Sequence, residues 1–211
     1  MSVINPKELI MKRTLNPEQI DVLGEISNIS MGTAATTVSV IVNQPVDITV
    51  PHVSVINRSE SLDDYDDVCV FVQIQYVKGL FGSNVFILKE RDVLCLASLM
   101  MGGDGKTLDP AINEMHMSAI SEAMNQMMGS SATSMSSMLD LPIDISTPEC
   151  MKIDVRSIKF FEKMFATDND LFVKIAFRMQ VGDLIDSTMV QLFPIGFAGQ
   201  MCEPFLRKIH S

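Results

Sequence analysis

One stretch of this chain occurs twice, and the duplication constrains the fold more than any other feature. Residues 25–51 and 122–148 align without a gap, with every matching pair 97 positions apart. Repetition at a fixed offset indicates an internal duplication, so we expect two similar halves related by a pseudo-twofold axis. The identical pairs are Glu25/Glu122, Asn28/Asn125, Met31/Met128, Gly32/Gly129, Ala35/Ala132, Thr36/Thr133, Ser39/Ser136, Pro45/Pro142, Asp47/Asp144, Ile48/Ile145 and Pro51/Pro148.

The repeated polar residues fall on one face of a predicted helix. Positions spaced by four, three and four residues share a helix face. A carboxylate beside a carboxamide on such a face can engage a partner's cation and position a water molecule. The alternative is an ordinary solvated face of an amphipathic helix, but repetition of both residue types favours a function. The stripe consists of Asp21, Glu25, Asn28 and Gly32 in the first copy and of Ser118, Glu122, Asn125 and Gly129 in the second.

Charge and hydropathy exclude several classes of function. The 211 residues carry a net charge of −10, which argues against binding to nucleic acid or to an anionic membrane, because both need a basic surface. No apolar run reaches the roughly 18 to 20 residues of a membrane span, and no signal peptide opens the chain. The 17 methionines either fill the core or form a methionine-rich docking surface.

Cysteine and histidine spacing indicates neither disulfides nor a metal site. The cysteines are far apart and form no C-x-x-C pair, so we interpret them as buried free thiols in a reducing, cytoplasmic compartment. The three histidines lack the spacing of metal ligands, and we expect this chain to bind no cofactor. The cysteines are Cys69, Cys95, Cys150 and Cys202, and the histidines are His52, His116 and His210.

Element by element, the two halves follow the same order. Each is predicted to contain a long helix, a strand interrupted by proline, a hairpin and a short helix. Asn16-Pro17 and Asp109-Pro110 read as helix starts, with an N-cap followed by proline. The first half is predicted as helix 16–42, strand 46–56, an acidic solvated loop 59–67, strands 67–77 and 82–89, and helix 90–101. The second is predicted as helix 109–139, strand 141–155, a short extra helix 157–165, strands 171–180 and 184–193, and helix 195–209.

The domain prediction follows from this order. Residues 1–15 form an N-terminal arm, and 16–211 form a single domain made of two repeats, 16–105 and 109–210. The fold class is α/β in the α+β sense, a pseudo-twofold duplication with two long helices and short helices packed on a largely antiparallel sheet. The glycine-rich run 102–106 follows a helix and lacks phosphate-loop spacing, so it is predicted as a helix C-cap and linker.

The duplicated stripe resembles the signature of the CheC / CheX / FliY family of response-regulator phosphatases. That signature is Asp or Ser, three residues, Glu, two residues, Asn, twenty-two residues and Pro. The chain matches it twice, and the resemblance extends over residues 16–209. The residues after each Asn look most like the middle, CheC-like domain of the flagellar motor switch phosphatases. The matching positions are Asp21, Glu25, Asn28 and Pro51, and Ser118, Glu122, Asn125 and Pro148.

The resemblance implies hydrolysis of the aspartyl phosphate of the chemotaxis response regulator CheY. It assigns Asn28 and Asn125 to orienting the attacking water, and Glu25 and Glu122 to pairing with the regulator's active-site lysine. Mg²⁺ is then held by the regulator. The other four signature residues, Asp21, Ser118, Pro51 and Pro148, take supporting roles.

The resemblance also implies partners and a location. Phosphorylated CheY is the expected partner, and the switch proteins FliM and FliG and the receptor deamidase CheD are further candidates. The expected place is the cytoplasm, at the cytoplasmic face of the flagellar basal body. The rival hypothesis is a non-catalytic adaptor of the switch that binds phosphorylated CheY without turnover. An unrelated α/β domain whose repeat has no function is a third reading, which burial of both asparagines would support.

Overall fold

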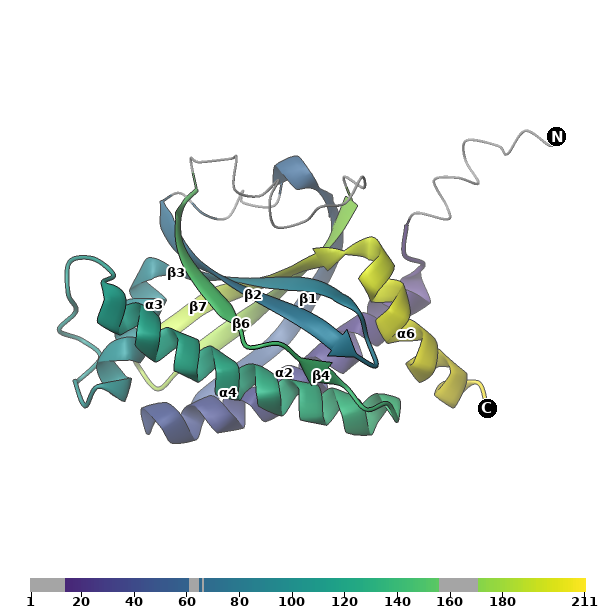
Figure 1. Ribbon diagram of the computed structural model, residues 1–211, viewed down its shortest axis with the longest axis horizontal. Coiled ribbons are helices and arrows are strands. Elements are labelled where there is room, and N and C mark those ends of the chain that lie inside the picture. The colour runs from purple at the N-terminus through teal and green to yellow at the C-terminus, as the bar shows by residue number, and fades with distance from the viewer. Residues whose placement is uncertain (1–13, 61–64, 66, 156–170) are drawn as a thin grey trace.

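The computed structural model describes residues 14–60, 65, 67–155 and 171–211 (Figure 1). Four α-helices of this part pack with an antiparallel sheet, so the predicted α+β class is confirmed. In chain order the elements are α2 (Pro17–Val42), β1 (Val46–Asn57), the 3-10 turn η1 (Arg58–Glu60), β2 (Val68–Lys78), β3 (Gly82–Lys89), α3 (Glu90–Met100), α4 (Glu114–Leu139), β4 (Asp144–Ile145), β5 (Glu149–Asp154), β6 (Leu171–Val181), β7 (Ile185–Pro194) and α6 (Ile195–Ile209).

Both long helices end in the same way. Helix α2 begins at the predicted cap, where the Asn16 side chain accepts from the Gln19 backbone N–H at 2.8 Å. It ends at Asn43, and α4 ends at the equivalent Asp140, each in the left-handed conformation with φ of 51° and 54°. Asn and Asp adopt this conformation more readily than other residues with a side chain, so the C-caps repeat with the helices.

The predicted start of the second long helix at Asp109-Pro110 is wrong. Helix α4 begins at Glu114, and its N-cap is Asn113, whose side chain accepts from the backbone N–H groups of Met115 and His116. The buried His116 ring accepts the Asn113 N–H at Nδ1 (2.9 Å), and its Nε2 lies 2.9 Å from Asp109. Asp109 therefore supports the cap through His116 and does not cap the helix itself.

The two halves share one sheet by exchanging strands. The strand order is β1-β6-β7-β3-β2-β4, and β5 also pairs with β2. The first half therefore gives β1 to the hairpin of the second half, and the second half gives β4 and β5 to the hairpin of the first. At the centre, Phe86 of β3 pairs with Gln191 of β7, and each lies four residues before the helix that follows its strand. The pseudo-twofold axis passes between them.

Helices α2 and α4 cross on one side of this sheet, and α3 and α6 lie toward its two ends (Figure 1). Across the crossing, Thr33 bonds to Ser134 and Thr37 to Ser130. These two contacts are equivalent under the 97-residue offset, and their midpoint falls on the buried Ala35 and Ala132. The larger core cluster lies between helices and sheet, and a smaller one, around Phe71 and Phe172, lies on the other sheet face.

Proline breaks the strand that follows each long helix, as predicted. In β1 the register shifts between Thr49 and His52, around Pro51. In the second half the strand is split into β4 and β5, with Pro148 between them. Proline has no N–H to donate to a ladder, so it belongs at such interruptions.

Several other predictions are confirmed or corrected. The hairpins and the last helix lie where predicted, and the run 102–106 follows α3 as a linker with positive φ at Gly102 and Gly105. Met124, Met127, Met128 and Met135 of α4 are buried in the core, whereas Met115 of the same helix is exposed. Of the cysteines, Cys150 is half-buried and the other three are buried, all as free thiols. The predicted acidic loop is partly replaced by η1, and Tyr65 within it is buried.

Other sequence predictions fall outside the described residues. These are the extra helix 157–165, most of the loop 59–67 and the arm up to residue 13.

The position of the α4 cap can be tested by mutation. Asn113→Ala removes the side chain that accepts two backbone N–H groups, so the free energy of unfolding should fall by about 1 kcal/mol. Urea denaturation measures this change, with Glu114→Ala at the neighbouring exposed position as the matched control. If the control costs as much as Asn113→Ala, the assignment of the cap is wrong.

Burial of Asp92 predicts an unusual dependence of stability on pH. Burial raises the pKa of the Asp92 carboxyl, which a hydrogen bond from Ser187 and the nearby charges of Lys89 and Arg91 only partly counteract. A carboxyl whose pKa is raised on folding destabilises the native state above that pKa, and the penalty vanishes below its unfolded pKa of about 3.9. Asp92→Asn should therefore raise the unfolding midpoint at pH 7, and the gain should shrink toward pH 4. A gain that is constant across this pH range would contradict this explanation.

Candidate functional site

The first copy of the signature assembles into one site. A cavity of about 710 Å³ lies between the amino-terminal half of α2 and strand β1. Asp21, Glu25 and Asn28 line it from the helix, and Pro51 and His52 line it from the strand. The three helical side chains are exposed and Pro51 is half-buried. All four residues that the sequence assigned to this site are therefore brought together.

Strand β1 reaches this place because of the strand exchange. It pairs with β6 of the other half, from Val46↔Val181 to Asn57↔Leu171, with the shift at Pro51. Next to the site, Gly24 of α2 faces Val53, and a β-carbon at Gly24 would lie 3.9 Å from that side chain. Helix α2 and strand β1 thus approach closely, and the polar stripe of α2 lies along their line of contact.

The second copy is assembled differently. Ser118, Glu122 and Asn125 are exposed on α4, as their counterparts are on α2. The cavity beside them, of about 560 Å³, is lined by Ser118 but not by Glu122 or Asn125. Pro148 is buried and does not line it. The second set of predicted residues on α4 therefore shares a helix face, and Ser118 is the member of the set that lines this cavity.

The two glutamates also have different surroundings. Glu122 accepts a short hydrogen bond from Gln126, one turn later on α4. The equivalent of Gln126 in the first copy is Ile29, which is 42% exposed and has no polar group to offer. Glu25 therefore lacks the intrahelical partner that holds Glu122.

Sequence reasoning missed two residues at the sites. His52 lines the first cavity and has Glu149 as its counterpart, whereas Lys152 lines the second cavity and has Val55 as its counterpart. An internal repeat is recognised from its identical positions, and the residues of these two pairs, His52 and Glu149, and Val55 and Lys152, differ between the copies. Comparing the non-identical positions next to each proline would have identified them.

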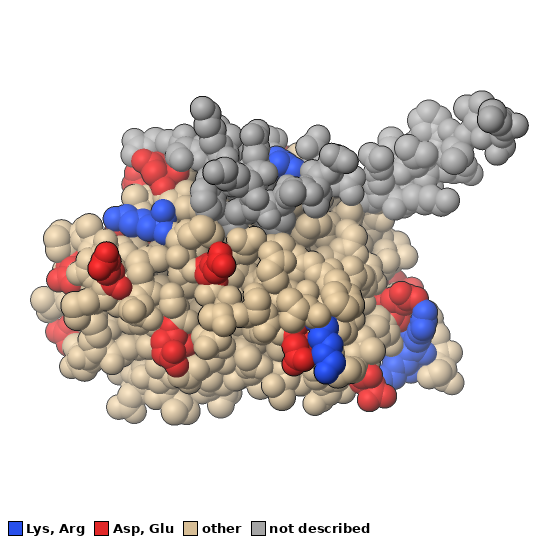
Figure 2. All heavy atoms as spheres, in the orientation of Figure 1, with Lys and Arg blue, Asp and Glu red and all other residues tan. Residues whose placement is uncertain are grey.

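The two helices that carry the stripes have no lysine or arginine side chains. Figure 2 shows scattered acidic and basic side chains on a largely uncharged surface over α4. The exposed carboxylates of the stripes therefore have no basic partner on their own helices.

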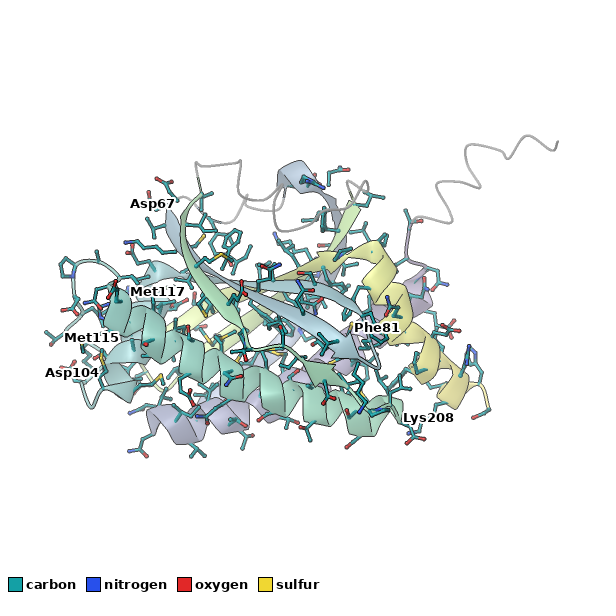
Figure 3. All side chains as sticks on the ribbon, in the orientation of Figure 1. Asp67, Phe81, Asp104, Met115, Met117 and Lys208 are labelled. Atoms are coloured by element: carbon teal, nitrogen blue, oxygen red, sulfur yellow. The ribbon has the colours of Figure 1, made fainter. Side chains whose placement is uncertain are left out.

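Exposed and half-buried apolar side chains lie in separate places. Figure 3 shows Met115 and Met117 near the beginning of α4, away from Phe81, which lies near α6.

The thiols are poorly suited to nucleophilic catalysis. Burial raises the pKa of Cys202 to about 12, and burial together with the nearby Asp154 does the same for Cys69. Burial also raises the pKa of Cys150, beside the second site, although a hydrogen bond with Ser121 opposes the shift. Because the thiolate is the nucleophile, these groups are held in the unreactive form at neutral pH.

The described part of the chain offers neither a group of metal ligands nor a membrane-spanning helix. Its carboxylates, histidines and cysteines form no group of three or more that could hold a metal ion. No helix there has both the length and the apolar character needed to cross a bilayer.

A glycine follows each asparagine by one helical turn. Gly32 and Gly129 are exposed in the interiors of α2 and α4. Glycine inside a helix is less favourable than alanine by about 1 kcal/mol. A β-carbon at either position would meet nothing within 4 Å, so packing within the chain does not require these glycines.

Comparison with known proteins agrees with this geometry. The family model of the CheC-like family matches residues 18–55 and 115–151, the two copies of helix and strand. The chain is 43% identical to the flagellar motor switch phosphatase FliY of Bacillus subtilis over 98% of its length. It also matches the crystal structure of Thermotoga maritima FliY, with a TM-score of 0.84 and 37% identity over 92% of this chain and 99% of that one.

The chain belongs to the CheC-like family.

Other relatives place this member in a wider group. The CheY-P phosphatase CheC of Bacillus subtilis is 27% identical over 64% of this chain and 66% of its own length. The FliG-FliM complex from H. pylori contains a chain with a TM-score of 0.70 at 14% identity, covering 88% of this chain and all of that one. At that identity the likeness shows a shared fold only. The chain spans 54% of the length of Bacillus subtilis FliY.

Proposed function

We propose that this chain hydrolyses the aspartyl phosphate of the response regulator CheY at the flagellar motor. The observation that carries the proposal is the Glu and Asn pair, exposed on a helix and repeated at the same offset on a second helix. The names of the relatives, a flagellar motor switch phosphatase and a CheY-P phosphatase, support the same substrate.

The proposed chemistry requires positioning more than reactive groups. Water attacks the phosphorus, the bond from phosphorus to the aspartyl oxygen breaks, and the carboxylate leaves as inorganic phosphate forms. Phosphoryl transfer of this kind depends on in-line placement of water and on stabilising charge. The amide of Asn28 or Asn125 would orient the water by hydrogen bonding, and the regulator would supply the Mg²⁺.

The carboxylates have an electrostatic role in this proposal. Glu25 and Glu122 would pair with the lysine of the regulator's active site. The absence of lysine and arginine from both helices supports this, because no neighbour on the same helix competes for the carboxylates. Asp21 and Ser118 would support the pair one turn earlier, and Pro51 and Pro148 would shape the adjoining strand.

We propose that the first site contributes more of the activity than the second. All four signature residues line the cavity of the first copy, whereas the cavity beside the second copy is lined by Ser118 and not by Glu122, Asn125 or Pro148. In the second copy, Gln126 already donates to one oxygen of Glu122 and restrains that side chain. Both differences favour docking at α2.

Location and partners belong to the same proposal. Phosphorylated CheY would be met at the cytoplasmic face of the motor, among the switch proteins FliM and FliG. Whether CheD stimulates the activity, as the family resemblance implies, is tested by adding CheD to the assay below.

Removing each asparagine tests the proposed sites. Phosphate release from phosphorylated CheY should fall more in Asn28→Ala than in Asn125→Ala, and the double variant should approach the regulator's own decay rate. Val40→Ala, at an 80% exposed position on α2, is the control and should behave as wild type. Unchanged decay in the asparagine variants would reject the sites. Binding of CheY without faster phosphate release by the wild type would favour the adaptor.

Neutralising the glutamates tests the ion pair. Glu25→Gln and Glu122→Gln should each weaken binding of CheY at their own site. Loss of the pair between Glu25 and the regulator's lysine should weaken binding by about tenfold. The effect should shrink as salt is raised, because salt screens exposed charges. Glu203→Gln on α6 makes the same change in net charge at an exposed position and should leave binding unaltered. A loss of equal size in Glu203→Gln would mean that net charge, not the pair, controls binding.

A further inference from the structure

We propose that Gly32 and Gly129 are specificity-determining positions, where bare helix backbone lets the response regulator approach closely enough for the preceding asparagine to act. The inference rests on the proposed phosphatase function and names a docking requirement that the Glu and Asn pairs do not provide.

The fold itself gives no reason for these two glycines. Three other glycines do have one, because Gly79, Gly82 and Gly105 have positive φ and a β-carbon at each would lie within 3 Å of another atom. Gly32 and Gly129 are helical, and a β-carbon there would meet nothing. The free chain would be more stable with alanine at both positions, so the reason must lie outside the free chain.

Their surroundings repeat in detail. The hydroxyl of Thr36 donates to the carbonyl of Gly32, and the hydroxyl of Thr133 donates to the carbonyl of Gly129 at 3.0 Å. Each hydroxyl is thereby turned back onto the helix. Gly129 also lines an open groove of about 850 Å³ between α2 and α4. Each asparagine is therefore followed by an exposed glycine whose carbonyl accepts a threonine hydroxyl, although only Gly129 lines the groove.

The short side chain of asparagine explains why this patch matters. To place water beside a phosphoryl group within the regulator's active site, the helix surface must come close to the regulator. A β-carbon at position 32 would lie about 5–6 Å from that of Asn28 on the same face. A methyl group there would hold the two surfaces apart and move the amide away from the water.

The continuity of the patch with the Glu and Asn stripe identifies the occupant. Glu25, Asn28 and Gly32 are successive exposed positions on one face of α2. A partner that engages Asn28 therefore covers Gly32 as well. The occupant is the phosphorylated receiver domain of CheY, in contact through backbone or small side chains around its active site.

The test uses Gly32→Ala, Gly129→Ala and the double variant in the full chain. Each should raise the midpoint of thermal unfolding, by roughly 2–4 °C. The double variant should lose on the order of 10- to 100-fold in kcat/KM for phosphate release, with weaker binding to CheY activated by beryllofluoride. Gly199→Ala, at another helical glycine where a β-carbon meets nothing, is the matched control and should keep full activity.

Each result bears on the proposal. Greater stability together with lost docking supports it, and unchanged binding and turnover in the double variant would overturn it. Lower stability of the variants would also overturn it, because the glycines would then serve the fold. If the wild type binds activated CheY without releasing phosphate, the proposed phosphatase function is rejected. The proposal for the glycines is then tested by comparing the binding of the glycine variants and the wild type to activated CheY. If the wild type does not bind, both fail.

Discussion

The packing of α2 against α4 across the pseudo-twofold axis is the interaction on which the rest of the structure depends. The small buried residues Ala35 and Ala132 mark the crossing, and the Thr33 and Thr37 hydroxyls bond across it to serines of the other helix. Small side chains allow two helices to approach closely, and helix separation depends on the residues at the contact. With the inner faces committed to each other and to the core, the stripes with Asn28 and Asn125 remain on the outside.

Strand exchange turns those exposed stripes into sites. Because β1 is held by β6 of the other half, it lies beside α2 and brings Pro51 next to Asn28. A duplicated chain need not keep its copies equal, however. The second strand is split at Pro148, which is buried, and Glu122 is held by Gln126. The same backbone plan therefore carries two sites with different surroundings.

Much of this organisation could be predicted from the sequence because it depends on local rules. Asn16-Pro17 is a strong helix start, and the 97-residue offset determines where the second helix ends once the first is placed. The start of α4 was mispredicted because Asp109-Pro110 has the same local pattern as Asn16-Pro17. The buried ring of His116 decides in favour of Asn113, and its burial depends on tertiary packing. The strand exchange could not be predicted, because strand order depends on contacts between distant segments. The unequal surroundings of Glu25 and Glu122 could have been predicted, because Gln126 lies one helical turn after Glu122 whereas the apolar Ile29 lies one turn after Glu25.

A structure of this chain bound to CheY activated by beryllofluoride would test the central claim most directly. We expect the receiver domain on the outer face of α2, with the Asn28 amide beside the acyl-phosphate position and the regulator's lysine paired with Glu25. We also expect a second, less occupied receiver domain at α4, with Asn125 in the same role. A receiver domain bound on the sheet face opposite the helices, with both asparagines exposed to solvent, would contradict the account.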